Sequence, residues 1–65
     1  MNDKFVTITG LTVKHETDAA LLVETADGEE VWLPLSQVEA VHNRDAPGAA
    51  AVEVARWIAE RKGLL

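Results

Sequence analysis

The chain begins with short runs in which apolar and polar side chains alternate, a pattern that predicts β-strands. Residues 4–14 are rich in β-branched side chains, but strict alternation divides their aliphatic residues between the two faces of the strand. One inserted residue at Gly10 would bring them to a single face, because glycine accepts the bulge conformation easily. We therefore predict a β-bulge at Gly10, with two short strands separated by a break as the alternative. The aliphatic residues concerned are Val6, Ile8, Leu11 and Val13.

A β-hairpin is predicted from two more apolar runs, residues 20–25 and 29–34, which flank the turn residues 26–28. A two-residue turn would mix apolar and acidic side chains on one face. A three-residue turn with Gly28 in the left-handed conformation separates them, and a buried face fixes such a register strongly. The preferred turn pairs Leu21 with Leu33 and Val23 with Val31 on an aliphatic face, and Leu22 with Trp32 and Glu24 with Glu30 on the reverse.

The second half of the chain predicts a short strand and a helix. Residues 38–42 are expected to form a fourth strand. Pro34 lacks a backbone donor, so it either ends the third strand or places that strand at an edge of the sheet. A helix over residues 47–62 is predicted from strong helix propensity, with Asp45 as its N-cap and Gly63 in the left-handed position beyond its end. Its apolar stripe would consist of Ala50, Ala51, Val54, Trp57 and Ile58.

These elements predict an α+β fold in a single small domain over residues 1–65. Three or four antiparallel strands would form a bent sheet, an SH3-like partial barrel, with one C-terminal helix. The helix is expected to cover part of the face that carries Leu22 and Trp32. A chain of 65 residues buries only about 60% of its unfolded surface, so its aliphatic core has to supply most of the stability.

Composition and charge narrow the classes of partner. The chain contains no cysteine, so it has neither a disulfide framework nor a thiolate metal site. Eleven acidic residues against six basic ones give a formal charge of −5, which weighs against direct binding to nucleic acid or to an anionic membrane. The start of the chain lacks the features of a signal peptide. We expect a cytoplasmic protein whose charge suits solubility, a basic partner or mimicry of a polyanion.

The reactive side chains do not form a catalytic pattern. His15 and His42 lack the spacing of a metal site, and a transition metal needs three or four ligands. Ser36 is not set in a nucleophile elbow, and the carboxylates of Glu24 and Glu30 would have no deep cleft on so small a sheet. We therefore predict a protein that is not an enzyme and that holds no metal or cofactor.

Carboxylates concentrate on the predicted hairpin, beside a tryptophan. Glu24 and Glu30 would lie opposite each other. Like charges in that position are unfavourable unless both carboxylates are well solvated or have a role in function. Trp32 has two interpretations: a core residue beneath the helix, which a small domain favours, or an anchor for a partner. The predicted partner-binding residues are Glu24, Asp27, Glu29, Glu30 and Trp32 on the hairpin, with Glu16 and Asp18 at the other end of the preceding strand pair.

The segment from Leu21 to Glu39, LLVETADGEEVWLPLSQVE, resembles a segment of small phage and prophage proteins. The shared features lie mostly in DGEEVWLPLSQ, and they imply a β-module without catalytic residues. In size, acidity and lack of cysteine the chain also resembles phage-encoded inhibitors of host defence, including anti-CRISPR proteins. That resemblance implies a DNA mimic in the host cytoplasm that occupies a basic nucleic-acid-binding groove, and it carries over no residue role.

Three functions follow, in order of preference. The first is a non-enzymatic inhibitor or adaptor whose acidic surface engages a basic protein surface, including the groove of a nucleic-acid-binding complex. The second is an accessory module of nucleic-acid metabolism with an SH3- or OB-like surface, which would need its six Lys and Arg residues on one face. The third is a structural homodimer that buries the Leu22 and Trp32 face between two copies.

Overall fold

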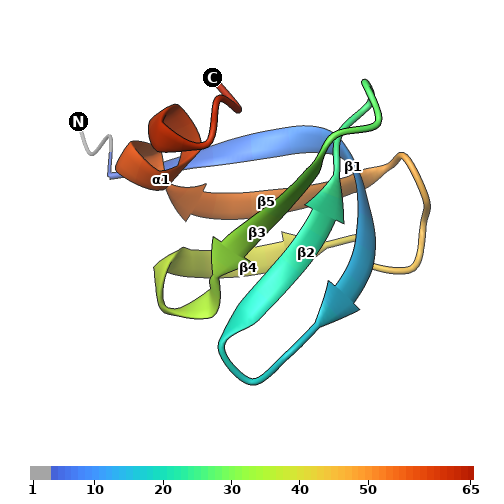
Figure 1. Ribbon diagram of the computed structural model, residues 1–65, viewed down its shortest axis with the longest axis horizontal. Helices are drawn as coiled ribbons and strands as arrows, with labels where there is room; N and C mark the ends of the chain where they lie inside the picture. The colour runs from blue at the N-terminus through green and yellow to red at the C-terminus, as the bar shows by residue number, and fades with distance from the viewer. Residues whose placement is uncertain (1–3) are drawn as a thin grey trace.

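Five antiparallel strands and one short helix make up residues 4–65, the part of the chain that the computed structural model describes (Figure 1). The elements are β1 (Phe5–Glu16), β2 (Ala20–Glu24), β3 (Glu30–Pro34), the 3₁₀ turn η1 (Leu35–Gln37), β4 (Val38–His42), β5 (Ala50–Ala55) and α1 (Arg56–Arg61). The sheet order is β3-β2-β1-β5-β4, so β3 and β4 are its edges. The α+β class is confirmed, but the sheet has five strands where three or four were expected. Residues 1–3 of the predicted domain lie outside the described residues.

A β-bulge at Gly10 bends β1, as the aliphatic pattern predicted. Three steps along β1, from Ile8 to Leu11, match only two steps along β5, from Val52 to Ala50. Gly10 has a φ of 71°, the left-handed conformation that glycine adopts without a steric penalty. The extra residue restores one inward face, so that Leu11 is buried and the other aliphatic residues pack against the core: Val6, Ile8 and Val13.

A second bulge, which the sequence did not predict, lies near the end of β1. Two steps along β1, from Val13 to His15, match a single step along β2, from Val23 to Leu22. As a result, His15 shares a face of the sheet with Leu22. The first half of β1 pairs with β5 and the second half with β2, so this long bent strand joins the two halves of the sheet (Figure 1).

The hairpin of β2 and β3 has the predicted three-residue turn. Gly28 has a φ of 87°, and the Thr25 amide donates a hydrogen bond of 2.8 Å to the Glu29 carbonyl across the turn. The preferred register is confirmed at every pair: Leu21 with Leu33, Leu22 with Trp32, Val23 with Val31, and Glu24 with Glu30. The aliphatic face points inward and is the buried one.

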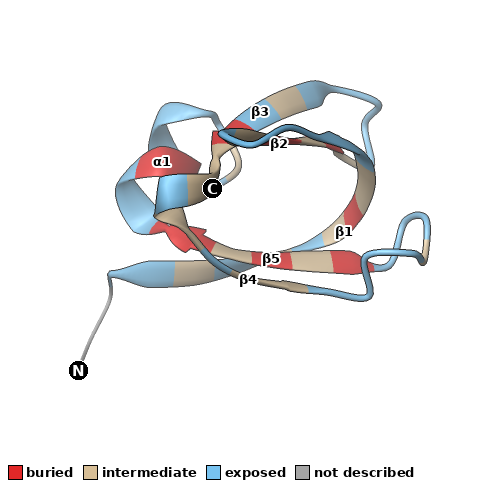
Figure 2. Cartoon of the chain, turned by 90° about the horizontal axis from the view of Figure 1, so that it is seen from below, coloured by how far each residue is buried: buried red, intermediate tan, exposed pale blue. Residues whose placement is uncertain are grey.

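The core is aliphatic and lies between the curled sheet and α1, as the buried segments in Figure 2 show. The helix closes one end of the curl with Ile58 and Ala59. The complete set of buried residues is Leu11, Leu21, Val23, Leu33, Ala50, Val52, Val54, Ala55, Ile58 and Ala59. Within residues 4–65, no helix has the length and apolarity that crossing a membrane would require.

The predicted helix over residues 47–62 is wrong in its first half. Residues 50–55 form β5, which lies between β1 and β4, and α1 begins only after it. Strand pairing on both sides and burial of alternate side chains outweigh the helix propensity of alanine there. Asp45, expected as a helix N-cap, therefore lies in the loop before β5. The alternating buried residues of β5 are Ala50, Val52 and Val54.

The end of α1 matches its prediction, whereas the apolar stripe does not. Gly63 has a φ of 74°, and its amide donates to the Glu60 carbonyl at 3.2 Å. The Leu64 amide donates to the Ala59 carbonyl at 2.8 Å, which completes a Schellman ending. Trp57, which the helical stripe placed in the core, is 53% exposed, because this six-residue helix turns its other side inward.

Replacing Gly28 with alanine should lower the free energy of unfolding by about 1–2 kcal/mol, the usual cost of the left-handed conformation for a residue with a Cβ. An added Cβ at Gly28 would meet no atom within 4 Å, so the variant isolates the backbone cost. Urea denaturation followed by circular dichroism measures the change. Gly28→Asn is the control and should lose less, because asparagine tolerates this conformation. Unchanged stability of Gly28→Ala would contradict the assigned turn.

Leu33→Ala should lower the free energy of unfolding by about 2–5 kcal/mol, because the Leu33 side chain is completely buried. Leu22→Ala removes the same atoms from the opposite face of the hairpin and should cost distinctly less, since Leu22 is only half-buried. Denaturation of both variants measures the difference. A larger loss for Leu22→Ala would mean that the hairpin is shifted by one residue in solution.

Candidate functional site

The candidate site is the outer face of β1, β2 and β3, which consists of His15, Leu22, Glu24, Glu30 and Trp32. Directly opposite residues on neighbouring strands share a face of the sheet. His15, Leu22 and Trp32 thereby form one row across the three strands, and Glu24 and Glu30 belong to the next row. The hairpin register therefore brings a tryptophan and two carboxylates together, as the sequence indicated.

Trp32 lies at the surface of the outer face, 44% exposed, so the interpretation of Trp32 as a core residue is wrong. Its position opposite Leu22 turns the indole away from the core. The His15 ring meets the indole edge-on, with ring centroids 6.4 Å apart and ring planes at 89°. This contact depends on the second bulge of β1, which is why simple alternation along the sequence did not reveal it.

The outer face is open because α1 packs elsewhere. The helix was expected to cover the Leu22 and Trp32 face, but it packs against β1 and β5 at one end of the core (Figure 2). The Arg56 amide donates to the Lys4 carbonyl at 2.7 Å, which ties the start of the helix to the region where β1 begins. The position of the helix thus follows from β5, which leads directly into it, and leaves the indole in solvent.

The outer face carries more negative than positive charge. The Lys14 ammonium lies 3.9 Å from a carboxylate oxygen of Glu24, and both side chains are partly exposed, so water weakens their attraction. Glu30 is exposed and forms no ion pair with any residue between 4 and 65. Glu24 stands directly opposite Glu30, and only Glu24 has a lysine nearby, so this pair of carboxylates keeps a net negative charge.

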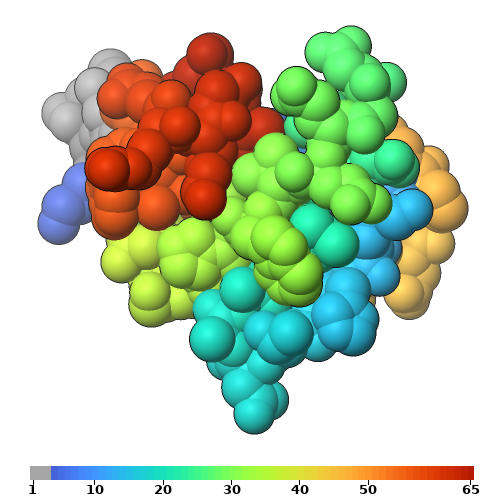
Figure 3. All heavy atoms as spheres, viewed as in Figure 1, coloured from blue at the N-terminus to red at the C-terminus, as the bar shows by residue number. Residues whose placement is uncertain are grey.

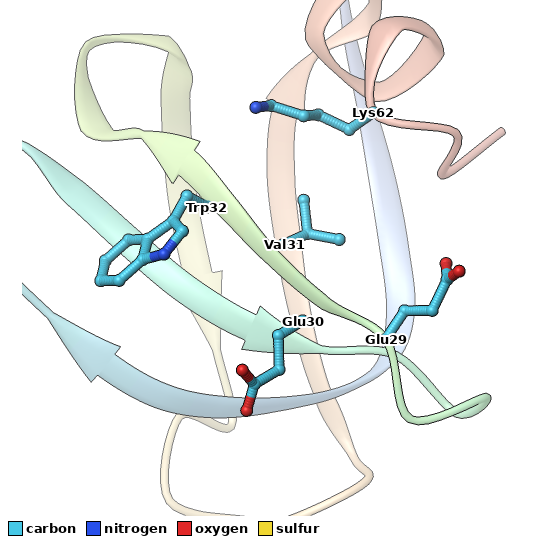
Figure 4. Close-up of a pocket in the computed structure, with 5 residues that line it drawn as sticks. All are labelled: Glu29, Glu30, Val31, Trp32 and Lys62. Carbon is cyan, nitrogen blue, oxygen red and sulfur yellow. The ribbon is translucent and has the colours of Figure 1, made fainter.

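Glu29, the residue directly before β3, lines an open groove of about 500 Å³ together with Glu30. The opposite wall comes from Lys62, the C-cap residue of α1. Figure 4 shows its side chain extending over Val31, with the two glutamates on the other side. No local pattern could have revealed this residue, because its place depends on where β5 delivers the helix. The groove is lined by Glu29, Glu30, Val31, Trp32 and Lys62.

Three predicted acidic residues lie away from the outer face. Glu16 stands opposite Leu21, so it belongs to the inner side of the sheet, and its carboxylate accepts a hydrogen bond from the Arg44 guanidinium. Asp18 lies in the exposed turn between β1 and β2, and Asp27 lies at the tip of the hairpin. The structure therefore places Glu24 and Glu30 in the row beside Trp32 but does not bring Glu16 or Asp18 to the same surface.

Basic and histidine side chains do not share a common centre. Lys14 and Arg44 interact with carboxylates on opposite faces of the sheet. Nε2 of His42, on β4, lies 2.7 Å from a carboxylate oxygen of Glu53, on β5. The other four basic residues lie directly before β1, in α1 or directly after α1: Lys4, Arg56, Arg61 and Lys62. Residues 4–65 contain no group of three or more His, Cys, Asp or Glu side chains that could hold a metal ion.

No family model, curated protein or solved structure matches this chain. A functional conclusion therefore depends on the chemistry of the outer face itself. That face combines an exposed indole, an imidazole in contact with it, and two opposed carboxylates approached by a single lysine.

Proposed function

We propose that this protein is a non-enzymatic binding module whose outer face engages a Lys- or Arg-rich surface of another protein. The observation that carries the proposal is the position of Trp32, which is 44% exposed in the row beside Glu24 and Glu30. A chain of 65 residues has little apolar surface to spare for its core. Leaving an indole in solvent on the hairpin is therefore better explained by contact with a partner than by stability.

The groups of the outer face are those that recognise an arginine side chain. The face of an indole attracts a cation, and carboxylates bind a guanidinium through two parallel hydrogen bonds. Because the glutamates occupy the row next to Trp32, one arginine could stack on the ring while its guanidinium reaches a carboxylate. Phe5 and Trp57 are also exposed, but neither stands beside two opposed carboxylates in the sheet register.

For the partner, we propose a host complex that binds nucleic acid, with the chain acting as a phage-encoded inhibitor similar to anti-CRISPR proteins. An acidic protein can occupy a groove built for a phosphate backbone, because both ligands present negative charge to the same basic side chains. The formal charge of −5 supports this proposal. So does the concentration of carboxylates on one hairpin, at Glu24, Asp27, Glu29 and Glu30.

For the fold, we propose that the curled sheet is an SH3-like partial barrel. Three features support this assignment: the bent β1 shared by both halves of the sheet, the 3₁₀ turn between β3 and β4, and the aliphatic core inside the curl (Figure 2). Small barrels of this type host many unrelated functions. The fold therefore does not choose among the candidate functions, and the side chains of the outer face do.

The two other functions have less support. A module that reads nucleic acid needs its basic side chains on one face, whereas Lys14 and Arg44 are engaged by Glu24 and Glu16 on opposite faces. A homodimer formed through the outer face would bring the Glu24 and Glu30 pairs of two copies toward each other. The charge of −5 on each copy adds to that repulsion.

Trp32→Ala should weaken binding of an oligoarginine peptide about tenfold or more, as expected when an interface hot spot is removed. Isothermal titration calorimetry at low salt measures the affinity, and circular dichroism checks the fold. Trp57→Ala is the matched control, because it removes an exposed indole from α1, away from the outer face. The control should keep its affinity, and similar losses in both variants would contradict the proposal.

Reversing the three hairpin glutamates to lysine should abolish binding of the same peptide. Binding by the unchanged protein should also weaken as salt rises, because a Debye length of about 10 Å at 0.1 M screens exposed charges. A control variant reverses three acidic residues elsewhere, so both variants have the same net charge. Normal binding by the hairpin variant would rule out the charged face as the binding surface. The variants are Glu24→Lys/Glu29→Lys/Glu30→Lys and Asp18→Lys/Glu39→Lys/Asp45→Lys.

A further inference from the structure

The hydrogen bonds at the two ends of the β2–β3 ladder define which backbone groups of β3 point outward. At one end, the Thr25 amide donates to the Glu29 carbonyl at 2.8 Å. At the other end, the Leu35 amide donates to the Ala19 carbonyl at 2.8 Å. Along an antiparallel ladder, residue pairs that exchange backbone hydrogen bonds alternate with pairs that do not. The bonds at the two ends assign the same pairs of β2 and β3 to the hydrogen-bonded kind.

This alternation puts Glu30 and Trp32 in non-bonded pairs, so that their N–H and C=O groups point away from β2 toward the free edge. Pro34 occupies the next position of this kind, which suits a residue without an N–H. Among residues 4–65, no hydrogen bond occupies the outward backbone groups of Glu30 or Trp32. The edge of β3 is therefore a template for one more strand.

The other edge of the sheet is less suited to pairing. Two steps along β4, from Val38 to Ala40, match one step along β5, from Val54 to Glu53, so a bulge interrupts this edge at Glu39. Bulges are one way in which proteins protect an edge strand from further pairing. In contrast, β3 pairs with β2 without a bulge along its whole length.

There is room for a chain segment beside β3. The groove of about 500 Å³ lies along this strand, between it and Lys62 (Figure 4). A second groove of about 230 Å³ shares Glu29 with the first and reaches Leu64 beyond the end of α1. Figure 3 shows the molecular surface hollowed between the C-terminal segment, in red, and the tip of the hairpin, in green.

We propose that the partner adds an extended segment to the edge of β3 as a sixth strand, with Lys or Arg at every second position. This inference rests on the proposed function and specifies the form of the basic partner. Side chains of an added strand alternate between the two faces, so every second one would lie beside Trp32 and Glu30. Those two side chains complement a cation, whereas the other face of the added strand would meet Val31 and Lys62 in the groove.

A second copy of the chain is a poor occupant of the same edge. Pairing of two β3 strands would bring the acidic hairpins of both copies together, including Glu29 and Glu30. Like charges on adjacent strands destabilise the pairing, and each copy carries a formal charge of −5. A basic segment instead meets charge of the opposite sign.

A comparison of Glu30→Pro with Glu30→Ala tests the strand addition. Both variants lose the carboxylate, but only proline removes the outward N–H, and an edge strand accepts proline where that N–H faces solvent. The probe is a peptide of alternating arginine and valine, and its affinity is measured by calorimetry. Glu30→Pro should bind it roughly fivefold or more weakly than Glu30→Ala, because a backbone hydrogen bond and close strand contact are lost.

Amide hydrogen exchange of the unchanged protein gives a second measurement that needs no variant. The peptide should slow exchange at the amides of Glu30 and Trp32, and this protection together with the proline effect supports the proposal. If the peptide shifts the Trp32 indole resonance but protects neither amide, strand addition is overturned while the outer face remains a binding surface. Absence of peptide binding at low salt overturns both. If sedimentation shows a dimer and the amides of Glu30 and Trp32 are protected without the peptide, the edge of β3 pairs with a second copy instead.

Discussion

The register of the β2–β3 hairpin is the constraint on which both the core and the candidate site depend. Side chains alternate along a strand, so a slip of one residue would bury Trp32 and the opposed glutamates and expose the aliphatic pairs. Gly28, at a φ of 87°, allows the three-residue turn that sets this register. The same pairing that buries Leu21 and Leu33 therefore places an indole beside two carboxylates in solvent. The core contacts and the candidate site thus lie on opposite faces of the same hairpin.

The remaining elements explain why that face stays open. Two bulges bend β1 so that it pairs with strands of both halves of the sheet, and the curl encloses a core of aliphatic side chains. The interior strand β5 lies between β1 and β4 and leads directly into α1 at one end of the core. A six-residue helix at that position closes the core but cannot also reach across the outer face. The side chains of the outer face thus remain available to a partner, and so does the unpaired edge of β3.

Features set by local signals could be predicted from the sequence, whereas those set by distant pairing could not. The hairpin register and the bulge at Gly10 each follow from a glycine within an aliphatic pattern, and the Schellman ending follows from Gly63 directly after the basic end of the predicted helix. The alanines of residues 50–55 favour a helix, which is why the predicted helix includes them, although the alternation of Val52, Glu53 and Val54 indicates a strand. Predicting the contact of His15 with Trp32 would have required knowledge of the second bulge in β1. Predicting the place of Lys62 would have required the position of the helix. Neither is encoded in a short stretch of sequence.

The central claim is that Trp32 is exposed in a negatively charged environment, and fluorescence quenching tests it most directly. In a Trp57→Phe variant, Trp32 is the sole tryptophan. An acidic surface concentrates cations and repels anions near the indole. The quenching of Trp32 by each ion is divided by the quenching of free tryptophan by the same ion. This ratio should therefore be larger for caesium than for iodide. Stronger quenching by iodide would contradict the negative environment, and weak quenching by both ions would mean that Trp32 is buried.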